Sequence, residues 1–128
     1  MYPINRVRTK DEYRNEMYLY ECINSASQKV RFYLTNYDTY YFAVLYIMSK
    51  KKREFETLKQ TGKDGLKSLV WVKNCMKDFI DNIAKKDDLI IVQWDDSRRK
   101  RAYAYGLKSL GFHFGRFEKK ESLMLKIK

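Results

Sequence analysis

Residues 66–92, LKSLVWVKNCMKDFIDNIAKKDDLIIV, decide the fold because they predict a long amphipathic helix that runs directly into a short buried strand. The apolar residues of the helix recur at helical spacing and are Leu66, Leu69, Val70, Met76, Phe79, Ile80 and Ile83. Lys85 and Lys86 follow, where cations suit the negative end of the helix dipole. Residues 89–92 are uniformly apolar and rich in β-branched side chains, which is typical of a strand covered on both faces. The stretch therefore predicts the helix and the second strand of a βαβ unit.

The chain before this helix is predicted to form an opening strand, a first helix and a three-strand meander. The opening strand is expected at residues 4–8, and Asp11 is expected to cap the helix that follows. The apolar residues of that helix are Tyr13, Met17 and Tyr20. From Lys29 the apolar period changes to two, which predicts strand rather than helix. The meander strands are expected at residues 29–35, 40–48 and 53–60.

The chain after the buried strand predicts a second helix and two last strands. Asp95, Asp96 and Ser97 are expected to cap the helix, and Gly111 is expected to end it. Its inward face consists of Ala102, Tyr103, Leu107 and Leu110. The last strands are expected at residues 112–117 and 123–127. The predicted fold is α/β (α+β), with the order β-α-β-β-β-α-β-α-β-β, a mixed sheet and helices on both faces.

The composition favours a single domain over residues 1–128 with a real core, since 45% of the residues are hydrophobic. The formal net charge of +11 is compatible with a nucleic acid, an anionic cofactor or an acidic protein surface as partner. A lysine-rich solvated exterior accounts for the same excess. The charge therefore leaves the class of partner open.

Several kinds of site are not expected. Cys22 and Cys75 lie in apolar periodic segments, which predicts two buried thiols in a reducing compartment. With His113 as the one histidine, the chain offers no metal site. No stretch approaches the ~20 apolar residues of a membrane-spanning helix, and the chain opens without an apolar leader. We therefore expect a cytoplasmic protein, as a monomer or homodimer.

The predicted order of elements resembles the GNAT-type N-acyltransferases over nearly the whole chain. The segment that carries the resemblance best runs from Arg101-Ala102-Tyr103 to Leu110-Gly111-Phe112 and is similar to the family's late helix, which commonly ends Leu-Gly-Phe. The chain also looks similar to small stand-alone GNAT-like proteins of bacteriophages, which would place it in the cytoplasm of a bacterial host. The resemblance implies acetyl-CoA, or another acyl-CoA, as the donor and an amine as the acceptor.

The resemblance also implies a place for the donor. In the family the pantetheine arm runs between the third meander strand and the first long helix, and the pyrophosphate lies on backbone N–H groups at the helix N-terminus. Asp64 and Leu66 stand where the family usually has small residues, so an ordinary capped helix start is the alternative. The residues expected to bind acyl-CoA are Thr61, Gly62, Lys63, Asp64, Gly65, Leu66 and Lys67.

The catalytic residues that the resemblance implies are an acid and a base. The family's tyrosine acid corresponds to Leu107, so Tyr103, one turn earlier on the same face, is the candidate acid; the alternative is a core tyrosine with a bonded hydroxyl. Glu54 and Glu56 are the candidate bases that would take a proton from the substrate ammonium. Their alternative role is pairing with neighbouring cations on the strand.

A second hypothesis is a catalytically degenerate GNAT-fold basic protein of phage origin, which binds nucleic acid or a host or virion protein. Tyr40, Tyr46 or Trp94 would then stack on bases. The basic residues expected to contact phosphates are Arg98, Arg99, Lys100 and Arg101, with Lys50, Lys51 and Lys52.

Overall fold

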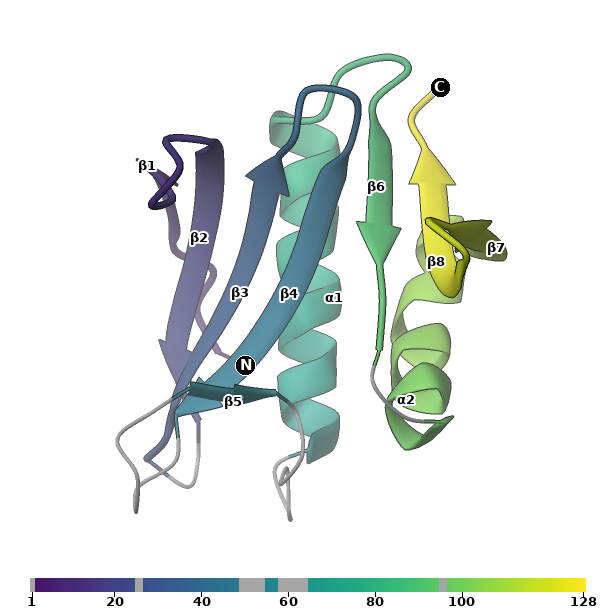
Figure 1. Cartoon of the computed structure of the whole chain (residues 1–128). Helices are drawn as coiled ribbons and strands as arrows, with labels where there is room; N and C mark the ends of the chain where they lie inside the picture. Colours follow the sequence, from purple (N-terminus) through teal and green to yellow (C-terminus); the bar gives the residue numbers. More distant parts are fainter. Residues whose placement is uncertain (1, 25–26, 49–54, 58–64, 95–96) are drawn as a thin grey trace.

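The computed structural model describes residues 2–24, 27–48, 55–57, 65–94 and 97–128. Over these residues the protein is α+β, with two α-helices and a mixed sheet (Figure 1). The elements are β1 (Arg6–Lys10), β2 (Glu16–Ile23), β3 (Lys29–Asn36), β4 (Tyr41–Met48), β5 (Phe55–Thr57), α1 (Gly65–Asn82), β6 (Leu89–Val92), α2 (Ser97–Leu107), a 3-10 turn (Lys108–Leu110), β7 (His113–Phe117) and β8 (Lys120–Lys126).

The strand order across the sheet is β1-β2-β3-β4-β6-β8-β7, and the short β5 pairs with β4. All neighbours are antiparallel except β4 and β6, which run parallel because α1 carries the chain back between them. The predicted βαβ unit is therefore present, and it joins an N-terminal meander to a C-terminal hairpin.

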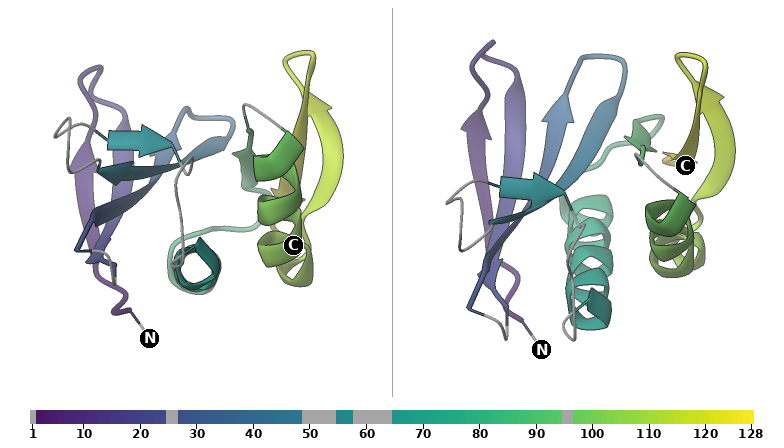
Figure 2. Two further views of the ribbon diagram at one scale, coloured as in Figure 1. Left: turned by 90° about the horizontal axis from the view of Figure 1, so that it is seen from below. Right: turned by 60° about the horizontal axis from the view of Figure 1, so that its bottom comes forward.

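Both described helices pack on one face of the sheet (Figures 1 and 2). The core lies between that face and the helices, and it takes alternate residues of β2, β3 and β4 together with the inward side of α1 and α2. The sequence predicts helices on both faces, whereas the two described helices lie on the same face. The opposite face of β2 and β3 carries partly buried residues such as Leu19 and Tyr33.

The helix expected after Asp11 is wrong, because residues 16–23 form β2 and pair with β1 in a hairpin. The Asp11 carboxylate accepts hydrogen bonds from the backbone N–H groups of Tyr13 at 2.9 Å and Asn15 at 2.8 Å, so it closes a turn rather than capping a helix. Within β2 the buried side chains alternate and are Tyr18, Tyr20 and Cys22. Burial of these alternate side chains against α1 therefore favours a strand over the helix that the spacing of Tyr13, Met17 and Tyr20 predicts.

The other predicted elements are close to those observed. Helix α1, strand β6 and helix α2 lie where the sequence predicts them. Gly111 ends the turn after α2 with φ of 101°, and its N–H donates to the carbonyl of Lys108. Of the strand expected at residues 53–60, the structure describes only β5.

Candidate functional site

The parallel strands β4 and β6 stay paired over only three residues, Tyr41–Ala43 in β4 and Ile90–Val92 in β6. Further along, β4 pairs through Tyr46–Met48 with β5 instead. Since β3 occupies the other edge of β4 throughout, β5 and β6 must share one edge, and β6 leaves it after Ala43. Ligands of open α/β sheets commonly bind outside the carboxyl ends of the parallel strands. We refer to this place as the β4–β6 junction.

Both helices begin at the end of the molecule to which the carboxyl ends of β4 and β6 point (Figure 1, bottom). Neither helix has an acidic residue in its first turn. Instead, Lys67 lies exposed in the first turn of α1, and Arg98, Arg99 and Lys100 follow Ser97 in α2. The positive ends of two helix dipoles and several basic residues therefore belong to this end of the molecule, which makes it suited to an anion.

The residues expected to bind acyl-CoA fall partly within the described structure. Gly65 and Leu66 open α1, and Lys67 is exposed. Thr61, Gly62, Lys63 and Asp64 lie outside the described residues, as do Asp95 and Asp96. The neighbour of β6 is β4 and not the strand expected at residues 53–60, so the divergence is bounded by different strands from those expected. Long-range pairing of this kind leaves no local sequence signal.

The candidate bases lie on or beside β5. Glu56 pairs in register with Ile47 of β4, which places its backbone at the edge of β4 beyond the divergence. Glu54 lies outside the described residues. The side chain of Glu56 lies outside the described structure, so its role as a base stays a prediction.

The candidate acid Tyr103 lies in the core. Its side chain is 6% exposed and belongs to the same cluster as Leu107 and Trp71. Burial against α1 and the sheet is what the inward face of α2 requires, and it favours the packing role of Tyr103 over the catalytic one.

The basic residues expected to contact phosphates are described in part. Lys100 forms an ion pair with Glu121 at 2.6 Å, and Arg101 is exposed. Arg98 and Arg99 are in the first turn of α2, and Lys50, Lys51 and Lys52 lie outside the described residues.

Two of the three aromatic residues expected to stack on bases are already packed within the protein. Tyr40 stacks on Tyr37 with ring centroids 5.3 Å apart and meets Phe117 edge-on at 4.6 Å. Trp94 is buried and meets Phe114 edge-on at 6.0 Å. The side chain of Tyr46 lies outside the described structure.

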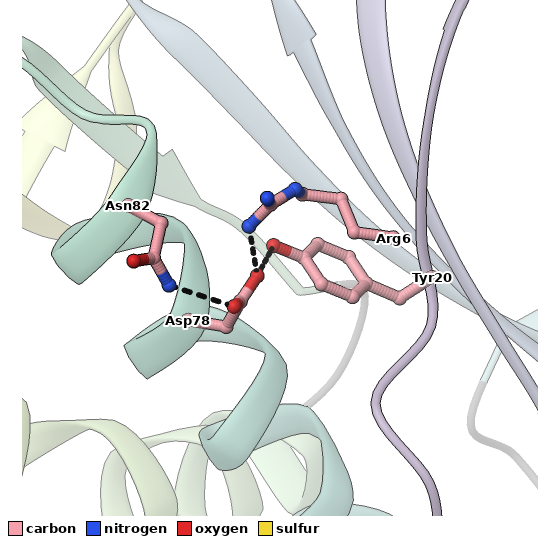
Figure 3. Close-up of polar contacts among 4 residues, drawn as sticks. All are labelled: Arg6, Tyr20, Asp78 and Asn82. Carbon is pink, nitrogen blue, oxygen red and sulfur yellow. Dashed lines mark hydrogen bonds and ion pairs between the residues drawn. The ribbon is translucent and has the colours of Figure 1, made fainter.

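A polar cluster that the sequence did not indicate joins β1 and β2 to α1 (Figure 3). One oxygen of Asp78, Oδ2, accepts hydrogen bonds from the Tyr20 hydroxyl and from Nη1 of Arg6, both at 2.6 Å. The other, Oδ1, accepts from Nδ2 of Asn82 at 2.8 Å. Tyr20, which is buried, and Asp78 are 58 residues apart, so no spacing rule connects them.

Burial and hydrogen bonding in this cluster shift the pKa of Tyr20 and the pKa of Asp78. Desolvation and the bond to Asp78 raise the pKa of Tyr20. Partial burial alone would raise the pKa of Asp78, but hydrogen bonds from Tyr20, Arg6 and Asn82 together hold it below its ordinary value. Asp78 follows Gly65 by thirteen residues, which is about 20 Å along the helix axis, so the cluster lies far from the start of α1. Its role is to fix α1 on the sheet.

Cys22 and Cys75 are both free and buried, as predicted. Desolvation raises the pKa of the Cys75 thiol, which keeps it protonated and unreactive. Among the residues that the structure describes, no group of three or more metal-ligating side chains comes together. No helix in the same part of the chain is long and apolar enough to cross a membrane.

Comparisons of the chain with protein-family models, with curated proteins and with solved structures find no match. The function therefore has to follow from the chemistry of these residues and from the resemblance carried by the segment that ends Leu110-Gly111-Phe112.

Proposed function

We propose that this chain is a GNAT-like N-acyltransferase that binds an acyl-CoA at the β4–β6 junction and transfers the acyl group to an amine. The observation that carries the proposal is the separation of β4 from β6 after three paired residues, at the end of the molecule where α1 begins. The family resemblance implies a donor site of this kind, where a strand and the first long helix receive the pantetheine arm. Here the strand beside the divergence is β4.

The charges at the junction suit the phosphates of coenzyme A. The first N–H groups of an α-helix have no partners within the helix and carry its positive partial charge. The first turn of α1 has no carboxylate to neutralise that charge, and its exposed charged residue is Lys67. A pyrophosphate therefore fits the residues Gly65, Leu66 and Lys67.

The reaction needs a neutral amine. Glu56 or Glu54 takes the proton of the substrate ammonium, directly or through water, and the amine nitrogen then bonds to the thioester carbonyl carbon. The bonded nitrogen releases its second proton to water, the carbon–sulfur bond breaks, and the thiolate takes a proton to leave as the free thiol. Because Tyr103 lies in the core, we assign to solvent the proton that the thiolate takes.

Calorimetric titration with acetyl-CoA tests the donor site. We expect Lys67→Glu to weaken binding by about 3- to 30-fold, because two charge changes beside a helix N-terminus each contribute about 0.3–1 kcal/mol. A glutamate in the first turn stabilises the helix itself, so the loss would not come from unfolding. The matched control is Lys126→Glu, which is expected to leave the affinity for acetyl-CoA unchanged. Lys126 is exposed and pairs with Leu89 at the other end of β6. No heat at millimolar acetyl-CoA would refute the proposal.

The assignment of Tyr103 to the core gives a second prediction. Loss of a general acid lowers turnover by about 10²- to 10⁴-fold, whereas loss of one buried hydroxyl lowers the free energy of unfolding by about 1 kcal/mol. We expect Tyr103→Phe to change the rate of CoA release from acetyl-CoA by less than about 10-fold and to show only the stability effect. Release of CoA is followed with a thiol reagent and stability by urea unfolding. A rate loss of about 100-fold at unchanged stability would return Tyr103 to the catalytic role.

A further inference from the structure

Residues 97–117 form the most basic part of the chain. They contain no aspartate or glutamate, and their six cations are Arg98, Arg99, Lys100, Arg101, Lys108 and Arg116. These residues span α2, the 3-10 turn and β7, which lie side by side because Lys100 of α2 and Lys108 of the turn both reach Phe114 of β7. The cations therefore belong to elements that are neighbours in space as well as in sequence, on one side of the molecule.

Two exposed aromatic rings lie in the same elements. Tyr105 is 77% exposed, and Phe114 is 38% exposed. The Nζ atoms of Lys100 and Lys108 lie 5.1 and 4.8 Å from the Phe114 ring centroid. Arg101 lies four residues before Tyr105 and Lys108 three residues after it, and all three side chains are exposed. We refer to Lys100, Arg101, Tyr105, Lys108 and Phe114 as the α2–β7 face.

We infer that the α2–β7 face binds single-stranded nucleic acid. Lysine and arginine side chains attract phosphates without regard to sequence, and exposed aromatic rings provide surfaces on which unpaired bases stack. In a duplex the bases are already stacked on one another, so the rings would gain nothing there. An acidic protein segment would satisfy the cations but leave the rings of Tyr105 and Phe114 unused. The combination of rings and cations therefore favours the single strand.

One carboxylate opposes this binding. Glu121 of β8 is held by Lys100 at 2.6 Å, and about a third of the Lys100 side chain and half of the Glu121 side chain remain exposed. The pair neutralises one of the cations beside Phe114. Removal of the carboxylate by Glu121→Gln frees Lys100 for a phosphate and should strengthen binding, which is an effect that damage to the fold would not produce.

Fluorescence anisotropy with a labelled twelve-nucleotide oligouridine tests the inference. Three or four phosphate contacts on a single strand predict a slope of about −2 to −3 for log K against log salt concentration. We expect Tyr105→Ala to weaken binding by about 5- to 50-fold through loss of stacking. The matched control is Tyr13→Ala, because Tyr13 is 78% exposed at the β1–β2 turn and lies outside the face. Both side chains are so exposed that neither change should affect folding.

Charge changes provide a second comparison. Lys108→Glu should weaken binding and reduce the salt slope by about 0.7 for each phosphate that is no longer neutralised, whereas Lys86→Glu, an exposed lysine between α1 and β6, should not. An oligothymidine of equal length distinguishes RNA from DNA. The inference is overturned if Tyr105→Ala and Tyr13→Ala bind equally, or if a twelve-base-pair duplex or a polyglutamate peptide competes as well as the single strand. These assays contain no acyl-CoA, so their outcome is independent of the proposed acyltransferase activity.

Discussion

Replacement of Trp71 by alanine is expected to lower the free energy of unfolding by about 4 kcal/mol, since truncation of a buried tryptophan leaves a large cavity. Trp71 is 1% exposed on the sheet-facing side of α1. Its indole N–H also donates to the carbonyl of Pro3 at 2.9 Å, which ties the segment before β1 to the helix. The change therefore removes both core packing and the anchor of the N-terminal segment.

Urea unfolding followed by far-ultraviolet circular dichroism measures this effect. The neighbouring Val70 is 45% exposed, so Val70→Ala is the matched control and should cost less than about 0.5 kcal/mol. Trp71→Phe keeps most of the ring but loses the bond to Pro3, and it should cost about 1–2 kcal/mol. If Trp71→Ala does not fold, the phenylalanine variant still gives a measurable value. Equal stability of Trp71→Phe and the wild type would show that the bond to Pro3 contributes nothing.

The parts of the fold that the sequence predicts well are those with one strong local pattern. In α1 the apolar residues keep helical spacing over five turns, and in β6 every residue is apolar, so each segment admits one interpretation. The segment of β2 admits two, because Tyr13, Met17 and Tyr20 fit a helix while Tyr18, Tyr20 and Cys22 fit a strand. The choice between the two is made by packing of Tyr20 beneath α1, which lies far away in the sequence.

The candidate site is predictable from the sequence only in outline. The apolar spacing from Leu66 predicts the start of α1 to within one residue, but the divergence of β4 and β6 depends on which strands become neighbours in the sheet. The α2–β7 face shows the same division. The cations of residues 98–101 are visible in the sequence, whereas the arrangement of Lys100 and Lys108 around Phe114 depends on how the C-terminal hairpin packs against α2.

Substitution of Asp78 by asparagine is expected to lower the free energy of unfolding by about 2 kcal/mol, because hydrogen bonds to a charged group contribute about 1.5–3 kcal/mol. Asp78 accepts such bonds from both Tyr20 and Arg6, and the buried Tyr20 hydroxyl has little access to water as a replacement. The matched control is Asp81→Asn on the same helix. Asp81 pairs with Lys77 at 3.2 Å on the surface, and such a pair contributes about 0.3–0.5 kcal/mol.

The pH dependence of stability separates the charge of Asp78 from its packing. Because the pKa of Asp78 in the folded protein lies below its ordinary value of 3.8, its contribution is complete above about pH 5 and is lost as the pH falls through the folded-state pKa. Glu16 also has a lowered pKa, so the wild type loses stability in acid for more than one reason. We therefore expect Asp78→Asn to reduce the loss between about pH 5 and pH 2 without abolishing it. Urea midpoints across this range measure the effect, and parallel curves for Asp78→Asn and the wild type would show that the Arg6–Tyr20–Asp78 cluster does not depend on charge.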